Sequence, residues 1–532
     1  MPSKISRTLI PVAVLATGIA AIAAAQSPQT LAPAVQPAQN AVAPAAAIAP
    51  PGGAPRSFAD LTARLAPAVV NVSTTQKVEM GRMRRMPGQQ GPQGQPSNPL
   101  EEFFRRFQEQ QEGGEPVTRE ATSLGSGFII AADGYIVTNN HVISAGEGRN
   151  QPVESITVTL TDRREYTARV VGRDTLTDLA LLKIEATGLP FVQFGNSETT
   201  RVGDWSIAIG NPFGLGGTVT AGIISALHRD IGSGQYDRYI QTDASINQGN
   251  SGGPLFDLAG NVIGINTAIF SPTGGNVGLG FAIPAELAKP VVDQLKASGA
   301  VKRGYLGVAI QRLSSDIAAG LGLPKDKGEI VASIEANGPA ARAGVRQGDV
   351  ILTVGGREVN YDNSLSYIVA TTPIGTTIPI ELFRDAKRIK VNAIIAQRPS
   401  EAVVAQRAGM AGSDDEPVVE DNSKAPGIEA AKASLGITLQ PLTTVLRQQL
   451  RLDEKVQGVV IAGISPSSDA ATKGLQRGDI IVKIGQKPVS SPAEAAAAVE
   501  AERKAGKATV LMLVQRGSTP ARYTGVKLIP AK

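Results

Sequence analysis

The segment NQGNSGGP, residues 247–254, decides between the folds that this chain can adopt. Clusters of Gly, Asn and Ser usually form turns, because glycine supplies positive φ angles and Asn or Ser bonds its own backbone. The same segment contains Gly-x-Ser-x-Gly, the sharp turn that presents the nucleophilic serine of α/β-hydrolases. Ser251 is therefore either an ordinary turn residue or a nucleophile, and the rest of the sequence has to decide.

The two histidines of the chain, His141 and His228, make the search for a catalytic base short. A nucleophilic serine needs a base within hydrogen-bond reach. Both histidines precede Ser251, whereas α/β-hydrolases place the histidine after the serine, so that fold is excluded and a chymotrypsin-like order fits. His141 lies in TNNHVI, where a predicted strand ends, and is the candidate base. His228 lies in SALHRD, which we interpret as a loop without a catalytic role.

Three aspartates could orient the base: Asp162, Asp174 and Asp178. Asp178 directly precedes the apolar run LALLK, and a carboxylate at the edge of a buried strand is costly unless it holds a partner such as a histidine. Asp162 and Asp174 are predicted to lie in a turn and a loop. We therefore favour Asp178 as the third member and keep Asp174 as the alternative.

Length and composition bound the class of protein. The chain has 532 residues, too many for one core, with 19% charged and 42% hydrophobic residues, as in globular domains joined by linkers. The net charge is +5 and aromatic residues make up 4%, with no clustered basic surface, so no nucleic-acid partner is expected. There is no cysteine, which excludes disulfides and a cysteine nucleophile. No metal or cofactor is expected.

The N-terminus is typical of an exported protein. Residues 1–25 combine Lys4 and Arg7 with an apolar run that ends in three alanines, the pattern of a signal peptide. Cleavage near Ala25 is favoured over retention as an anchor, and the periplasm is the expected compartment. Residues 26–56 are rich in Ala and Pro and are predicted to be a spacer.

Residues 57–298 are predicted to form one domain, with a long irregular insertion at 77–120. Short β-type runs at 127–130, 135–138, 156–160 and 179–182 are separated by turn signals, a spacing that favours a β-sandwich or barrel. A helical pattern at 284–298 closes the region.

The C-terminal half contains an internal repeat. Residues 328–359 align without gaps on residues 458–489, with Gly344, Gly348 and Asp349 recurring as Gly474, Gly478 and Asp479. Two copies are too few for a solenoid, so we predict two homologous domains, 302–397 and 432–531. The acidic segment 398–431 between them is predicted to be a linker.

Five segments in order, TNNHVI, TDLALLKI, AIGNPFG, QTDASINQGNSGGPL and GINTAI, resemble the HtrA/Deg family of serine proteases. This resemblance implies a mainly β chain: a trypsin-like double β-barrel protease domain followed by two PDZ domains. It also implies a triad of His141, Asp178 and Ser251. The oxyanion hole would lie at Gly249, Asn250 and Ser251.

The resemblance also implies where substrates bind. The position that selects basic substrates in trypsin-like enzymes is Ser245, so basic specificity is not expected. The cleft would be lined by small and apolar residues, and the PDZ domains would hold peptides at their carboxylate-binding loops. The cleft residues are Thr267, Ala268, Ile269, Phe270 and Ser271; the PDZ1 residues are Arg303, Gly304, Tyr305, Leu306, Gly307, Val308, Ala309 and Ile310; the PDZ2 residues are Ser434, Leu435, Gly436 and Ile437. Arg303 and Lys432 precede the two loops, where they either assist capture or are ordinary surface residues.

The expected function is ATP-independent cleavage of misfolded or damaged exported proteins by a serine endopeptidase, with PDZ domains that recruit C-terminal peptides and regulate activity. The alternatives are a holdase chaperone that uses the same cleft without cutting, and a PDZ scaffold with a dead protease domain; the presence of all three triad residues disfavours both. A homo-oligomer, a trimer or a multiple of trimers, is expected from the resemblance, with its size open.

Overall fold

The computed structural model describes residues 55–77, 120–145, 151–212, 217–247, 249–272, 275–400, 403, 434–450, 452, 453 and 456–530. The predicted signal peptide, nearly all of the spacer, the interior of the 77–120 insertion and most of the 398–431 linker lie outside these residues. Within them, no helix combines the length and apolarity needed to cross a bilayer.

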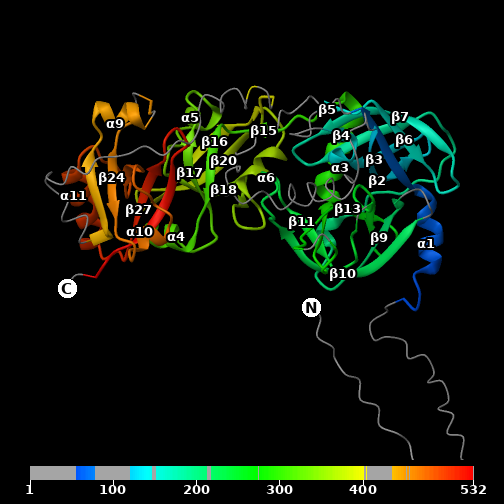
Figure 1. Ribbon diagram of the computed structural model, residues 1–532, viewed down its shortest axis with the longest axis horizontal. Helices are drawn as coiled ribbons and strands as arrows, with labels where there is room; N and C mark the ends of the chain where they lie inside the picture. Colours follow the sequence, from blue (N-terminus) through cyan, green and yellow to red (C-terminus); the bar gives the residue numbers. More distant parts are fainter. Residues whose placement is uncertain are drawn as a thin grey trace, which may run out of the picture. The chain divides into compact units, whose positions relative to one another are not determined.

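Barrel 1 is a closed six-stranded antiparallel barrel in the first half of the protease region (Figure 1). Val70, Val72, Ile129 and Ile136 are among the buried side chains of its core. In barrel order, its strands are β1 (Val69–Lys77), β2 (Glu120–Ala131), β3 (Tyr135–Asn139), β8 (Leu179–Ile184), β7 (Glu165–Asp174) and β6 (Ser155–Thr159). The two-stranded pair β4 (Ser144–Ala145) and β5 (Gln151–Pro152) lies outside the barrel.

Barrel 2 repeats this architecture with the following strands. Its core contains Ala208, Ile224, Ile240 and Leu255. In barrel order, its strands are β10 (Thr218–Arg229), β11 (Tyr239–Thr242), β14 (Gly280–Pro284), β13 (Val262–Ile269), β12 (Pro254–Phe256) and β9 (Trp205–Gly210). The mainly β, double-barrel prediction is confirmed. His228, however, lies in β10 and not in a loop, with φ of 56°, because the strand continues to Arg229.

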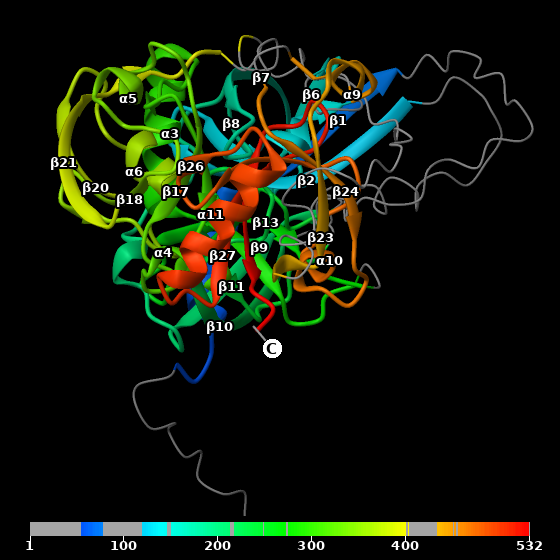
Figure 2. The same ribbon diagram turned by 90° about the vertical axis from the view of Figure 1, so that its left-hand side faces the viewer.

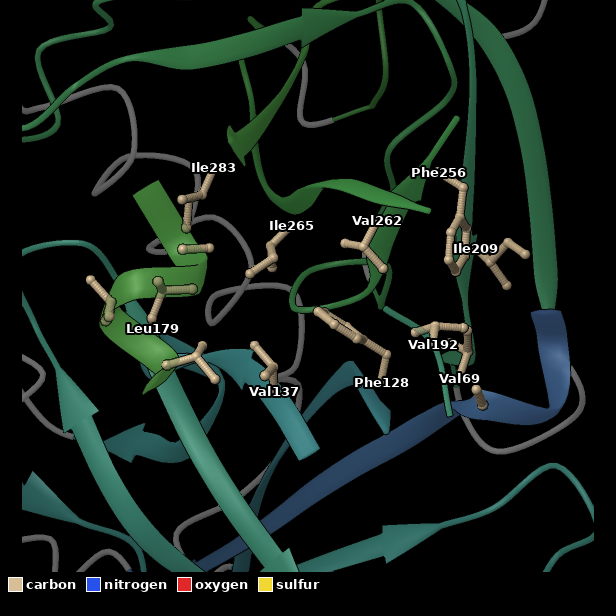
Figure 3. Packing of buried hydrophobic residues seen from close by; sticks show 14 of the residues in the cluster. Val69, Phe128, Val137, Leu179, Val192, Ile209, Phe256, Val262, Ile265 and Ile283 are labelled. Atoms are coloured by element: carbon tan, nitrogen blue, oxygen red, sulfur yellow. The ribbon is translucent and has the colours of Figure 1, made fainter. Parts of the chain in front are cut away.

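A third hydrophobic cluster fills the seam between the barrels. Phe128, Val137 and Leu179 come from barrel 1, and Phe256 and Ile265 come from barrel 2. Figure 3 shows these side chains pointing toward one another. Because strand side chains alternate in direction, β2 places Ile129 inside barrel 1 and Phe128 in the seam. Position 126 points the same way as Phe128, toward barrel 2.

Helices cover the outside of the seam. The apolar side of helix α3 (Ala285–Ser298) joins the seam cluster through Ala288, Val291 and Leu295, and it ends at Gly299 in the left-handed conformation. The short helix α1 (Ala59–Leu65) begins the described unit and buries Leu65 in the same cluster. Helix α3 matches the helical pattern predicted at 284–298. The remaining helical turns of the region are η1 (Ala66–Ala68), η2 (Asn140–Ile143) and η3 (Ser197–Thr199).

Each of the two repeats forms an antiparallel sheet with five strands in its main order and one further strand paired at its side. In the first repeat, the strands are β16 (Val308–Arg312), β17 (Glu329–Ile334), β18 (Val350–Val354), β20 (Thr377–Arg384) and β21 (Lys387–Ile394), with β19 (Arg357–Glu358), β15 (Gly304–Tyr305), β22 (Ala396–Gln397), α4 (Ser315–Leu321), α5 (Pro339–Arg342) and α6 (Leu365–Ala370). In the second, they are β23 (Ile437–Pro441), β24 (Val459–Ile464), β25 (Ile480–Ile484), β27 (Thr509–Gln515) and β28 (Arg522–Lys527), with β26 (Lys487–Pro488), α9 (Thr444–Gln449), α10 (Asp469–Thr472) and α11 (Pro492–Lys504). Figure 2 shows α11 crossing in front of β27.

The repeated aspartates are explained by one ion pair in each domain. Asp349 and Asp479 are both 1% exposed. Arg384 donates from Nε and Nη2 to the two oxygens of Asp349, at 2.7 and 2.6 Å, and Arg516 does the same to Asp479, at 2.7 and 2.9 Å. A buried carboxylate needs such a bidentate partner, so the Gly-Asp of each repeat is explained by an ion pair inside its own domain.

Candidate active site

His141 and Asp178 meet because they flank neighbouring strands at the same end of barrel 1. Asn139, the last residue of β3, pairs with Leu179, the first residue of β8. His141 follows β3 in the turn η2, and Asp178 directly precedes β8. The ring Nδ1 of His141 lies 2.5 Å from Oδ2 of Asp178, and the backbone N–H of His141 donates to Oδ1 at 2.8 Å. Both oxygens of the carboxylate therefore hold this one histidine.

The backbone of Asp178 is held in a strained conformation. Its φ is +55°, in the left-handed region that costs a non-glycine residue roughly 1–2 kcal/mol. Its carbonyl accepts two hydrogen bonds, from the N–H of Asn140 at 3.0 Å and from Nδ2 of Asn139 at 2.9 Å. Such strain persists only where the surroundings over-determine it, and it often marks a functional site. The same Nδ2 of Asn139 donates to Oγ1 of Thr267 in barrel 2, at 3.1 Å.

Ser251 lies in a tight turn between β11 and β12 and is 8% exposed. The N–H of Asn250 donates to the carbonyl of Asn247, and the N–H of Gly253 donates to the carbonyl of Asn250. Because a trans peptide points its C=O and N–H in opposite directions, the second bond turns the N–H of Ser251 away from Gly253. Neither the N–H of Gly249 nor that of Ser251 donates to another described residue. The turn thus presents two backbone donors on either side of Asn250.

Two glycines of this turn are required by the close packing around them. Gly249 has φ of +98°, and a Cβ there would lie 2.4 Å from Cβ of Pro212. Gly252 has φ of +84°, and its Cβ would lie 2.2 Å from the carbonyl oxygen of Ser126. Both glycines are therefore required because the turn packs closely against other parts of its own chain.

The predicted cleft residues lie at the end of β13. Thr267, Ala268 and Ile269 are buried in this strand, whereas Phe270, just beyond it, is 49% exposed. Ser271 follows Phe270. Ser245 accepts hydrogen bonds through its carbonyl from Thr220 Oγ1 and Asn250 Nδ2, so the turn of Ser251 is tied to the position that would select basic substrates.

Asp174 proves to have a different role from Asp178. It is the last residue of β7 and is 7% exposed, so the prediction that it lies in a loop was wrong. Its two oxygens accept from Nη1 and Nη2 of Arg303, at 2.9 and 2.5 Å. The guanidinium of Arg303 also lies over the ring of Tyr236. With 7% exposure, Arg303 is not an ordinary surface residue, and its charge is directed at Asp174. Lys432 lies outside the described residues.

The two predicted carboxylate-binding loops have the same geometry. In the first, Gly304 and Tyr305 pair with β22, Leu306 is buried, and Gly307 has φ of +73°. In the second, Leu435 is buried and Gly436 has φ of +71°. The carbonyls of Gly307 and Gly436 accept from Glu335 and Ser465, respectively, each at 2.8 Å.

Each loop leads into an edge strand of its sheet. Val308, Ala309 and Ile310 begin β16, and Ile437 begins β23, with Ser434 just before Leu435. Both strands stand at the end of the strand order in the described sheets. An edge strand is the place where an extended peptide can be added.

Sequence reasoning missed two residues at the site, Ser126 and Asn139. Both are fully buried and bridge the two barrels by hydrogen bonds. The only local signal for Ser126 was its place between two glycines within a β-type run. Among the described residues, no group of His, Cys, Asp and Glu could hold a metal ion.

Comparisons with known proteins agree with this geometry. Residues 125–265 match the family description "Trypsin-like peptidase domain", and residues 304–395 and 428–515 each match "PDZ domain". Over 494 residues, the chain is 42% identical to a probable periplasmic serine endoprotease DegP-like from Brucella suis, with 90% of each chain covered. It is 40% identical over 496 residues to a protein of the same name from Rhizobium meliloti, covering 90% of this chain and 93% of that one.

Solved structures of similar proteases cover about two thirds of the chain. The HtrA-type protease AlgW with tripeptide is 41% identical, with a TM-score of 0.51, and covers 65% of this chain and 99% of that chain. AlgW with decapeptide is also 41% identical, with a TM-score of 0.50 and the same coverage.

Proposed function

The chain belongs to the HtrA/Deg family of periplasmic serine endoproteases, and we propose that His141, Asp178 and Ser251 are the residues that perform its catalysis. The observation that carries this proposal is the clamp of Asp178 on His141. Both carboxylate oxygens bind the same histidine, which fixes the ring and its tautomer as the template for such a triad requires.

The proposed mechanism assigns one role to each side chain. With Nδ1 of His141 bound to Asp178, Nε2 is the nitrogen that takes the proton of the Ser251 hydroxyl as its oxygen attacks a peptide carbonyl. The carbonyl carbon becomes tetrahedral, and its oxygen takes up the electron pair. His141 then returns the proton to the leaving amine, and water repeats the sequence on the acyl-enzyme. Asp178 stays ionised and stabilises the imidazolium.

The oxyanion hole is proposed at the turn of residues 249–251. The backbone N–H groups of Gly249 and Ser251 are its donors, and Asn250 separates them. Donors that are already oriented toward the developing charge need no reorganisation during the reaction, and losing one typically costs about 10²–10³ in rate.

Substrate binding is proposed at two places. Thr267, Ala268 and Ile269 of β13, with Phe270 and Ser271, would line a cleft for small aliphatic side chains. The PDZ loops would hold C-terminal peptides of misfolded or damaged proteins, which would add as strands to β16 or β23. Arg303 binds Asp174, four residues before Asp178, so the first PDZ loop is in direct contact with the segment that carries the proposed triad acid. This contact supports regulation of activity by the first PDZ domain.

A digest of casein by the exported chain tests the proposal. Wild type, Ser251→Ala and the exposed control Ser298→Ala are compared at equal concentration. We expect cleavage by wild type and the control and none by Ser251→Ala, with a fluorophosphonate probe labelling only the chains that retain Ser251. Equal cleavage by wild type and Ser251→Ala would refute the assignment.

The same proteins test the holdase alternative and the assembly. Suppression of aggregation by wild type and Ser251→Ala alike, without cleavage by either, would favour a chaperone that does not cut. We propose a homo-oligomer built from trimers, and light scattering after size-exclusion chromatography measures its size.

A further inference from the structure

We propose that Ser126 is a positioning residue that fixes the oxyanion turn from the opposite barrel. This inference depends on the proposed roles of Gly249 and Ser251 and adds a residue outside the triad and outside the turn itself. Ser126 belongs to β2 of barrel 1, whereas the turn belongs to barrel 2.

Every polar group of Ser126 makes a hydrogen bond, and two of these bonds hold the turn. Its hydroxyl donates to the carbonyl of Gly249 at 2.5 Å, and its N–H donates to the carbonyl of Ser251 at 2.8 Å. Its Oγ accepts from the N–H of Asn211 at 2.8 Å. Its carbonyl accepts from Oγ1 of Thr138 at 2.7 Å. The two carbonyls on either side of Asn250 are therefore both held by one residue.

The position of Ser126 makes an incidental role difficult to explain. It shares the side of β2 with Phe128, which packs into the apolar seam, and it is 0% exposed. A hydroxyl buried in such a place costs roughly 1–3 kcal/mol unless its hydrogen bonds are made. An alanine or valine would suit the seam itself. A serine adds a hydroxyl that matches the carbonyl of Gly249 in the turn and the N–H of Asn211.

The neighbouring glycines allow the turn to approach this closely. A Cβ at Gly125 would lie 3.2 Å from the carbonyl oxygen of Ser251, and one at Gly253 would lie 3.2 Å from Cβ of Ser126. A Cβ at Gly252 would also collide with the carbonyl oxygen of Ser126. The GSG segment of β2 and the GNSGG segment of the turn are thus complementary surfaces, and Ser126 supplies the hydrogen bonds between them.

The consequence for catalysis follows from the geometry of the peptide units. The carbonyls of Gly249 and Ser251 belong to the peptide units 249–250 and 251–252, which flank the unit 250–251 that carries the N–H of Ser251. The first of them also adjoins the unit that carries the N–H of Gly249. Holding both carbonyls therefore limits the backbone rotations that would turn these donors. Without the hydroxyl, the Gly249 carbonyl and the N–H of Asn211 both lose their partner, while the bond from the N–H of Ser126 to Ser251 remains. A small misplacement of catalytic groups costs up to about 10²-fold, so we expect a loss of about 10- to 100-fold in kcat for Ser126→Ala.

Ser197→Ala is a matched control. The hydroxyl of Ser197 is also buried, donates one hydrogen bond, to Glu286 Oε2 at 2.8 Å, and accepts one, from the N–H of Glu286 at 3.0 Å. Ser126 likewise donates one and accepts one through Oγ. The control therefore loses the same number of hydrogen bonds in the same domain, at the first turn of α3 and away from the proposed site.

The experiment measures kcat and KM for a cleavable peptide, thermal unfolding, and binding of a peptide boronic acid that forms a tetrahedral adduct with the serine. For Ser126→Ala we expect a fall in kcat with KM within about twofold, and a parallel loss of boronate affinity. The pH dependence of kcat/KM should keep its shape, because His141 and Asp178 are untouched. Ser197→Ala should lose only stability.

Three outcomes separate the possibilities. If Ser126→Ala matches Ser197→Ala in kcat and boronate affinity, the inference is overturned while the triad assignment stands. A shifted pH profile would also overturn it, because Ser126 would then act through His141. If Ser251→Ala retains activity, the proposed function itself fails. Should Ser126→Ala not fold, Ser126→Cys, a weaker donor of similar size, is measured in the same way.

Discussion

The two barrels contribute to the proposed active site in different ways. Barrel 1 supplies side chains, His141 and Asp178, at the ends of two paired strands, and barrel 2 supplies a backbone turn that carries Ser251. Each half is held partly by the other: Asn139 of barrel 1 bonds Thr267 of barrel 2, and Ser126 holds the carbonyls of Gly249 and Ser251. The site therefore depends on the seam as much as on either barrel.

The largest effect is expected for Asp178→Asn in barrel 1. An amide in place of the carboxylate would favour the wrong tautomer of His141 and would not stabilise the imidazolium, so kcat should fall by about 10⁴. Asp174→Asn is the control, because Asp174 binds Arg303 and not His141. Peptide turnover by both variants tests the assignment, and a larger loss for Asp174→Asn would reverse it.

Gly252→Ala tests how closely barrel 2 packs on barrel 1. A side chain at φ of +84° and 2.2 Å from the Ser126 carbonyl forces the turn away, so we expect a loss of about 3 kcal/mol or more in unfolding free energy, with loss of cleavage. Gly203→Ala has a similar φ of +95° but no atom within 4 Å, and should cost only about 1–2 kcal/mol. Similar losses in urea unfolding would show that strain alone matters.

A pH-dependent difference between the barrels is expected at Asp237, in the loop between β10 and β11. Burial, with a contribution from Asp230, raises the pKa of Asp237 to about 6, although Ser233 donates to it. The folded state then holds a proton that the unfolded chain loses near pH 4, so stability falls as pH rises from 4 to above 6. The unfolding free energy of wild type should therefore fall between pH 4 and pH 8, and Asp237→Asn should remove about 2 kcal/mol of this fall.

Asp162→Asn in barrel 1 is the comparison for that measurement. The backbone N–H of Arg164 lowers the pKa of the exposed Asp162 carboxyl. Protonation of Asp162 therefore affects the stability of the fold only below pH 4. When unfolding in urea is measured from pH 4 to pH 8, the unfolding free energy of this variant should change with pH as it does in wild type. An unchanged slope in Asp237→Asn as well would contradict the expected titration of Asp237.

The smallest effect is expected for His228→Gln. His228 contacts Arg238 and Asp362, and burial lowers its pKa. Glutamine keeps an acceptor for Arg238, so kcat/KM and its pH profile should change by less than about twofold. With only two histidines in the chain, a displaced profile would mean that His228, and not His141 alone, controls the activity.

The amino-acid sequence was enough to predict the fold class, the double domain repeat and the candidate triad. The order of His141 before Ser251 excluded one hydrolase fold, and the constant spacing of the repeat marked two homologous domains. These features are local or depend only on order along the chain, so the sequence is enough to find them. The apolar run after Asp178 also identified it correctly as the residue that precedes a buried strand.

Contacts between residues far apart in the chain are visible only in the folded structure. Ser126 and Gly249 are 123 positions apart, and Arg303 and Asp174 are 129 apart. No local pattern distinguishes a serine in a β-run, or an arginine before a loop, from a surface residue. Their roles arise because folding buries segments that are far apart in the chain against one another, and each buried polar group then needs a partner on the facing segment.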